Sequence, residues 1–120
     1  MPTQIRQVLS SSSITGTTVQ NSGREDLGEI KDLMIDLAGG QIAYAVLSFG
    51  GFMGMGDKLF AIPWEAFSVI QEEKVFLLDV SKEKLEKAPG FDKDNWPDMA
   101  DVTWGKGIHN YYGYEPYWDI

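Results

Sequence analysis

The chain of 120 residues contains no cysteine and a single histidine, His109. Disulfide bonds, thiolate metal sites and cysteine nucleophiles are therefore excluded. One imidazole lacks the partners that a zinc site needs, and no G-x-S-x-G sequence supplies the serine of a hydrolase elbow. Because glycine and tyrosine lie near it in the sequence, we expect His109 at the surface or at an interface. We expect neither a metal ion nor an enzymatic activity.

Basic residues are also scarce. Ten Lys and Arg residues stand against eighteen Asp and Glu residues, which gives a formal net charge of −8. Nucleic-acid binders neutralise phosphates with clustered basic side chains, and lipid-surface anchors need a polybasic segment. We therefore expect no nucleic-acid partner, and one domain for a chain of this length. Residues 1–13 lack the apolar core of a secretory signal, so the expected location is the cytoplasm.

No segment has the composition and spacing typical of a membrane span or a cofactor site. Residues 37–56 carry no charge over twenty positions, but six of these are glycine, which favours a buried strand followed by a loop. The glycines of 50–56 precede Asp57 and Lys58 and then a strand, whereas a P-loop needs Lys-Ser or Lys-Thr and a helix. The acidic run 92–101 places Trp96 and Pro97 where a calcium loop needs an oxygen ligand and glycine. No cofactor is expected.

What the sequence does contain is a series of short, β-rich segments separated by turn residues. Alternation and turn residues predict strands over 14–20, 27–37, 41–49 and 58–62, one helical turn over 64–67, a short hairpin over 69–71 and 74–78, and a helix over 82–87 with Ser81 as its N-cap. The fold class predicted is all-β.

Three details of these strands carry structural predictions. The apolar parity changes between Ile30 and Leu33, which one extra residue near Lys31 and Asp32 would repair, so we predict a β-bulge there. Gly39-Gly40 predicts a tight hairpin, because both glycines can take positive φ. The strand 41–49 is apolar on both faces and therefore needs a cover on each.

Aromatic residues gather near the end of the sequence. From Gly90 on, 31 residues hold eight of the fifteen aromatic residues, too many for a solvated tail. We expect this extension to be ordered and to cover an outer face, with a second subunit favoured over its own barrel. The candidate protein-interaction residues are those of the glycine loop and the extension: Phe52, Met53, Met55, Trp104, Tyr111, Tyr112, Tyr114, Tyr117 and Trp118.

Three segments are similar to the core motifs of one family. Residues 26–30, 41–46 and 58–64 resemble, in order, those of the PRC-barrel, over roughly 13–88, and residues 88–97 resemble the extension of stand-alone bacterial members. The resemblance implies a small, strongly bent antiparallel β-barrel. In the family, this barrel occurs in the H subunit of the photosynthetic reaction centre and in the ribosome maturation factor RimM. The implied organisation is a flexible lead-in, 1–12, the barrel, 13–88, and an acidic then aromatic extension, 89–120.

The favoured hypothesis is a non-enzymatic, cytoplasmic adaptor that forms a homodimer and binds an unidentified protein. It leaves open a peripheral association with a membrane complex. One alternative is an auxiliary like the reaction-centre H subunit, in which surface carboxylates of Glu29, Asp32 and Asp36 relay protons. That role requires buried carboxylates with raised pKa values. The other alternative is a small-ligand barrel, which requires a roomy polar pocket.

Overall fold

The computed structural model describes residues 8–49, 58–70 and 74–119, and the glycine loop with its candidates Phe52, Met53 and Met55 lies outside these ranges. The elements, in chain order, are α1 (Ser11–Ile14), β1 (Thr18–Gln20), β2 (Asp26–Asp36), β3 (Gln41–Phe49), β4 (Lys58–Pro63), η1 (Trp64–Ala66), β5 (Phe67–Ile70), β6 (Val75–Leu78), α2 (Lys82–Glu86), α3 (Val102–Tyr112) and η3 (Tyr117–Asp119). No helix in the described part of the chain is long and apolar enough to cross a membrane.

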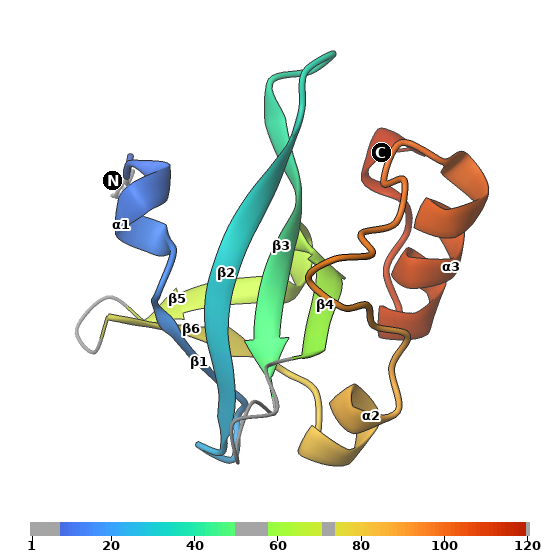
Figure 1. Ribbon diagram of the computed structural model, residues 1–120. Coiled ribbons are helices and arrows are strands. Elements are labelled where there is room, and N and C mark those ends of the chain that lie inside the picture. The colour runs from blue at the N-terminus through green and yellow to red at the C-terminus, as the bar shows by residue number, and fades with distance from the viewer. Residues whose placement is uncertain (1–7, 50–57, 71–73, 120) are drawn as a thin grey trace, which may run out of the picture.

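The six strands form one curled sheet in the order β4-β3-β2-β1-β6-β5. Figure 1 shows β5 and β6 running across the direction of β2 and β3, so the sheet bends into a half-barrel. This confirms the small, strongly bent β-fold. One ladder differs from the prediction, because β1 pairs with β6 in parallel while the other ladders are antiparallel. No local hairpin joins β1 to β6, so only the path of the whole sheet sets their direction.

The predicted bulge in β2 is confirmed. Ile30 lies opposite Leu47, and Asp32 lies opposite the next residue, Val46, so Lys31 is the extra residue. A bulge increases the local twist and bends the strand. Figure 1 shows the β2–β3 hairpin extending well beyond the rest of the sheet, and the bulge therefore lies between the barrel part of β2 and the projecting tip.

The turn at that tip is longer than predicted. Four residues, 37–40, separate β2 from β3, and the Gly40 N–H donates to the Asp36 carbonyl at 2.8 Å. Of the two glycines that can take positive φ, only Gly40 does, with φ +65°. The longer loop places Leu37 at the tip with its side chain 90% exposed.

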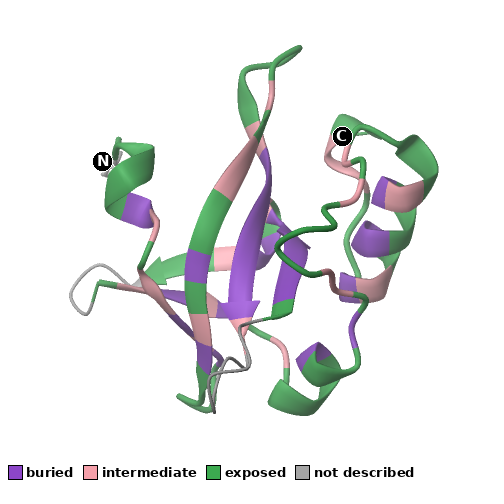
Figure 2. Ribbon diagram, viewed as in Figure 1, coloured by how far each residue is buried: buried purple, intermediate pink, exposed green. Residues whose placement is uncertain are grey.

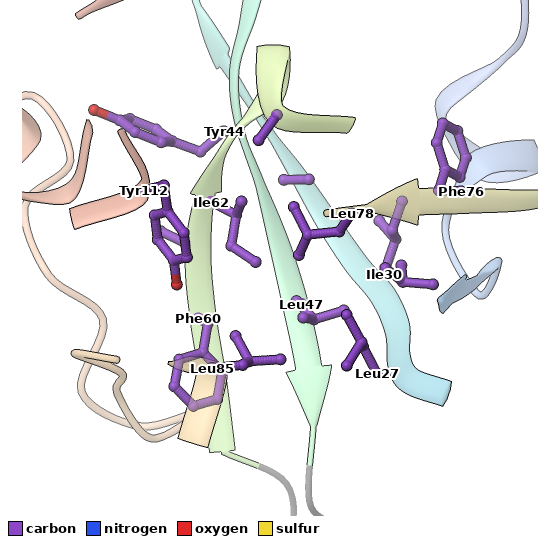
Figure 3. Packing of buried hydrophobic residues seen from close by; sticks show 14 of the residues in the cluster. Leu27, Ile30, Tyr44, Leu47, Phe60, Ile62, Phe76, Leu78, Leu85 and Tyr112 are labelled. Carbon is purple, nitrogen blue, oxygen red and sulfur yellow. The ribbon is translucent and has the colours of Figure 1, made fainter. Parts of the chain in front are cut away.

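The core lies inside the bend of the sheet. Leu27, Leu47 and Leu78 are at most 1% exposed and point toward one another from three strands, as Figure 3 shows. Leu85 of α2 closes one end of this core. The predicted Ser81 cap of that helix is confirmed, because the Ser81 hydroxyl accepts a hydrogen bond from the Lys84 N–H at 3.0 Å. The one-turn helix η1 after β4 is likewise as predicted.

Two α-helices were not predicted, and one of them covers the sheet. The short α1 occupies residues assigned to the lead-in and the first strand, while α3 runs through the aromatic extension. Asp101 caps α3 by accepting from the Thr103 N–H at 2.9 Å, and Gly113 ends it with φ +85°. Ile108 and Tyr112 are buried on its inner side, which Figure 2 shows facing β4.

The second apolar face of β3 is therefore covered by the same chain. Within β3, residues 43–48 are all buried, and the register places Tyr44 and Val46 on the face opposite to Ala45 and Leu47. Tyr44 contacts rings of the C-terminal extension. The sequence favoured a second subunit as this cover. Instead, α3 takes that place, because its buried residues recur at the three- and four-residue spacing of one helix face.

Candidate functional site

A surface cavity of about 520 Å³ opens between the hairpin tip and the C-terminal extension. It is lined by residues 34–37 of β2 and the turn, 43–44 of β3, 99–102 before and at the start of α3, and 117–118 of η3. We call this cavity the tip groove. Its position follows from the long β2–β3 hairpin, because a hairpin that ended with the rest of the sheet would leave residues 99–102 and 117–118 without an opposing wall.

One hydrogen bond joins the two walls. The Tyr117 hydroxyl donates to Asp36 Oδ2 at 2.5 Å, and the Ala38 N–H donates to Asp36 Oδ1 at 2.9 Å. These two donors hold the pKa of Asp36 below its usual range, the tyrosine bond being the larger cause. Burial, followed by the bond to the carboxylate, raises the pKa of Tyr117. At neutral pH, the pair is therefore an anionic carboxylate and a neutral phenol.

An aromatic cluster supports the floor of the groove. Tyr44 is 1% exposed, and its ring centroid lies 5.3 Å from Trp104, 5.4 Å from His109 and 6.2 Å from Tyr117. Its hydroxyl is buried without a hydrogen-bond partner among the described residues, and burial raises the pKa of Tyr44 to about 12. The ring of Tyr44 thus acts as packing for the extension, and its hydroxyl is left unpaired.

His109 is buried, contrary to the expectation of a surface or interface histidine. Its side chain is 0% exposed, and Nδ1 lies 2.8 Å from the Gly105 carbonyl one helical turn earlier, so Nδ1 carries the proton. Nε2 has no partner among the described residues. The ring of Trp118 packs against the imidazole, with the two ring centroids 5.5 Å apart. The inward face of α3 explains this burial, and the sequence analysis did not recognise that helix.

The close packing of α3 depends on one glycine. A Cβ atom at Gly105 would lie 2.7 Å from Trp118 Cη2 and 2.8 Å from the Tyr44 hydroxyl oxygen. Such distances are shorter than ordinary contacts, so only glycine lets the helix, the strand and the chain end meet here. Gly107, on the other side of the helix, has open space around it.

The predicted interaction residues separate into distinct places. Tyr117 and Trp118 line the tip groove, and Trp104 packs behind it on Tyr44. Tyr112 is buried, and burial raises the pKa of its hydroxyl. Tyr111 lies against α2 instead, where its hydroxyl donates to the Lys84 carbonyl at 2.6 Å. Tyr114 is 38% exposed and does not line the groove.

The predicted carboxylates are not gathered. Glu29 and Asp32 are exposed along β2, and only Asp36 reaches the groove. The sequence analysis missed Met34, Met99 and Asp101 as lining residues. A capping aspartate before a helix was a readable signal, whereas nothing in the sequence brings Met34 and Met99 together. Within the described ranges, no three His, Asp or Glu side chains form a cluster able to hold a metal ion.

The sequence model of the PRC-barrel domain matches residues 6–85, more than half of the chain, so the chain belongs to the PRC-barrel family. Comparison with curated protein sequences gave no match. Among solved structures, a chain described as the 16S ribosomal RNA processing protein RimM of Pseudomonas aeruginosa is similar, with 18% identity and a TM-score of 0.45. The similarity covers 62% of this chain and 45% of the other, less than half of that protein's length.

The family match has a consequence for the groove. It ends at residue 85, within α2, before α3 begins. One wall of the tip groove, residues 34–37, therefore belongs to the matched barrel, and the wall formed by 99–102 and 117–118 lies beyond it. The groove is thus formed where the family domain meets the extension of this chain.

Proposed function

We propose that this PRC-barrel protein is a non-enzymatic adaptor that works in the cytoplasm and binds another protein through the tip groove. The observation that carries the proposal is the exposure of apolar side chains around that groove: Ile35 is 50%, Leu37 90% and Val102 53% exposed. Apolar side chains that line or flank one concavity are typical of interaction sites. The groove opens at the surface above the buried Tyr44, so a partner can dock without opening the barrel.

The ionisable groups of the groove support binding rather than proton transfer. General acids and bases work best with pKa values near the working pH. Here, hydrogen bonds lower the pKa of Asp36, and burial raises the pKa values of Tyr44 and Tyr117. These three groups are thus held away from neutrality, which suits a fixed charge and neutral phenols in a recognition surface.

The two alternatives receive less support. A proton relay like that proposed for the reaction-centre H subunit requires buried carboxylates with raised pKa values, yet Glu29 and Asp32 are exposed and the pKa of Asp36 is lowered. A small-ligand barrel requires a polar interior pocket. The tip groove lies outside the barrel, and most of the side chains that line it are apolar, which favours a protein segment.

The homodimer also remains a proposal, with a different surface in its support. The described part of β4 is paired with β3 on one side and bridged by Phe91 on the other, with N···O distances of 2.9 and 2.8 Å between Leu59 and Phe91. Among the described residues, β5 pairs only with β6, and Ser68 and Val69 on it are exposed. An open edge strand favours pairing with a second copy. Sedimentation velocity of the full chain tests this, and a monomer at high micromolar concentration would end the dimer proposal.

Affinity capture with matched variants tests the adaptor proposal. Immobilised wild-type protein, Leu37→Ser and Val8→Ser are exposed to the same native lysate, and the retained proteins are quantified by mass spectrometry. Leu37 and Val8 are both exposed apolar residues, but only Leu37 lines the groove. We expect at least one protein to be retained by the wild type and by Val8→Ser and lost with Leu37→Ser. Identical retention by all three would refute docking at the groove.

A further inference from the structure

The charge of the tip groove is unbalanced. Asp36 and Asp101 line it, and no lysine or arginine of the described residues does. Asp36 accepts from the Tyr117 hydroxyl and from the backbone N–H groups of Ala38 and Gly39. Asp101 Oδ1 accepts from the N–H groups of Thr103 and Trp104. Because each carboxylate oxygen has two lone-pair sites, both groups can accept further bonds. The groove therefore presents negative charge with unused acceptor capacity.

The other lining groups suit the stem of a long cationic side chain. The rings of Tyr117 and Trp118 line the same cavity as the two carboxylates, together with Met34 and Met99. Aromatic faces attract ammonium and guanidinium groups, and methionine adapts to irregular apolar partners. Lysine and arginine lay their methylene stems on apolar surface while the charged head reaches a polar group. The groove offers both features side by side.

We propose that the tip groove binds a segment of another protein in which apolar residues flank a lysine or an arginine. This inference rests on the proposed adaptor function and names the chemistry of its partner. The cationic head reaches Asp36 and Asp101, while the flanking apolar side chains pack on the exposed Ile35, Leu37 and Val102. The cavity of about 520 Å³ is within the size range of sites that enclose a few side chains.

Charge complementarity separates this occupant from the others. A second copy of the chain would bring a net charge of −8 to a groove that already holds two carboxylates, and like charges across an interface cost affinity. Nucleic acid and anionic lipid surfaces meet the same repulsion. A basic and apolar protein segment gains from both the charge and the apolar lining.

Selection from a phage-displayed library of random heptapeptides tests the proposal without knowledge of the natural partner. Peptides are selected on the wild-type protein after depletion on Leu37→Ser, so that groove binders are enriched. We expect the enriched peptides to combine lysine or arginine with neighbouring aliphatic or aromatic residues. Enriched peptides without basic residues, or no enrichment above the unselected library, would overturn the proposal.

Synthetic forms of the best peptide then measure the charge contribution by fluorescence anisotropy. Replacing its basic residue by glutamine should weaken binding to the wild type about fivefold, as a partly exposed ion pair of about 1 kcal/mol implies. The protein variant Asp36→Asn with Asp101→Asn should cause a similar loss. Asparagine still caps a helix, and its amide can face the Tyr117 hydroxyl, so the geometry is kept.

The matched control removes the same charge elsewhere. Glu29→Gln with Asp92→Asn changes two exposed carboxylates that do not line the groove, and it should bind the peptide as the wild type does. Equal losses in both double variants would mean that only overall charge matters, and would overturn the proposed contacts. If lysate proteins are captured through the groove but selected peptides are not basic, the adaptor function survives and this inference fails. If Leu37→Ser changes neither experiment, both fail.

Discussion

Replacement of Tyr44 by phenylalanine is expected to stabilise the protein. The tyrosine is 1% exposed, and its hydroxyl is buried without a hydrogen-bond partner among the described residues. Phenylalanine keeps the ring contacts with Trp104 and Tyr117 and removes only the oxygen. Since an unpaired buried polar group costs free energy in the folded state alone, its removal should raise the free energy of unfolding.

The magnitude follows from the cost of leaving a hydroxyl unpaired. That cost is about 1–3 kcal/mol, and part of it is offset by the packing contacts that the oxygen makes. We expect a gain of about 1 kcal/mol, which for a domain of this size raises Tm by about 4 °C. Tyr112→Phe should behave similarly, because the Tyr112 hydroxyl is also buried and unpartnered among the described residues.

Urea unfolding followed by tryptophan fluorescence, with a thermal scan as a second readout, measures the effect. Tyr117→Phe is the matched control: it also removes one hydroxyl, but this one donates to Asp36, so the variant should be less stable than the wild type. A loss of stability in Tyr44→Phe would refute the reasoning. It would mean that the Tyr44 hydroxyl has a partner in solution; the unpaired Nε2 of His109 is a candidate, since the two ring centroids lie 5.4 Å apart.

Three further predictions concern glycine packing and pH. Gly107→Ala should stabilise the protein by about 1 kcal/mol in chemical unfolding, because alanine is the better helix former and the position has open space. Gly105→Ala should gain less or lose stability, because its Cβ meets Trp118. Equal gains in the two variants would contradict the packing described. Gly28→Ala should reduce soluble, folded protein strongly, since φ is +109° and the Cβ would lie 2.0 Å from the Ser48 carbonyl oxygen; near wild-type stability would show that β2 can shift. The stability advantage of the wild type over Tyr117→Phe should be complete between pH 3.8 and pH 10.0, the ordinary pKa values of an aspartate and a tyrosine. It should shrink below this range as the pH falls through the lowered pKa of Asp36, and above it as the pH rises and Tyr117 ionises. Urea unfolding across pH measures this difference, and a constant difference would mean that the bond contributes nothing.

The barrel was predictable from the sequence because its signals are local. The strand over 41–49, the bulge near Lys31 and the Ser81 cap each depend on residues close in the chain, where alternation, parity and capping chemistry act directly. The same local rules could have found α3 between Asp101 and Gly113. The abundance of aromatic residues there suggested an interface and obscured the helical spacing of the residues that become buried.

The tip groove, in contrast, was decided by tertiary structure alone. Asp36 and Tyr117 are 81 positions apart, and only the projecting hairpin and the return of the chain after α3 bring them together. The parallel pairing of β1 with β6 depends in the same way on the path of the whole sheet. Composition by itself determined that the chain is acidic and rich in aromatic residues near its end. Packing determined that these aromatic residues cover their own barrel and that two carboxylates share one apolar groove, because such contacts depend on which surfaces the fold leaves to be buried.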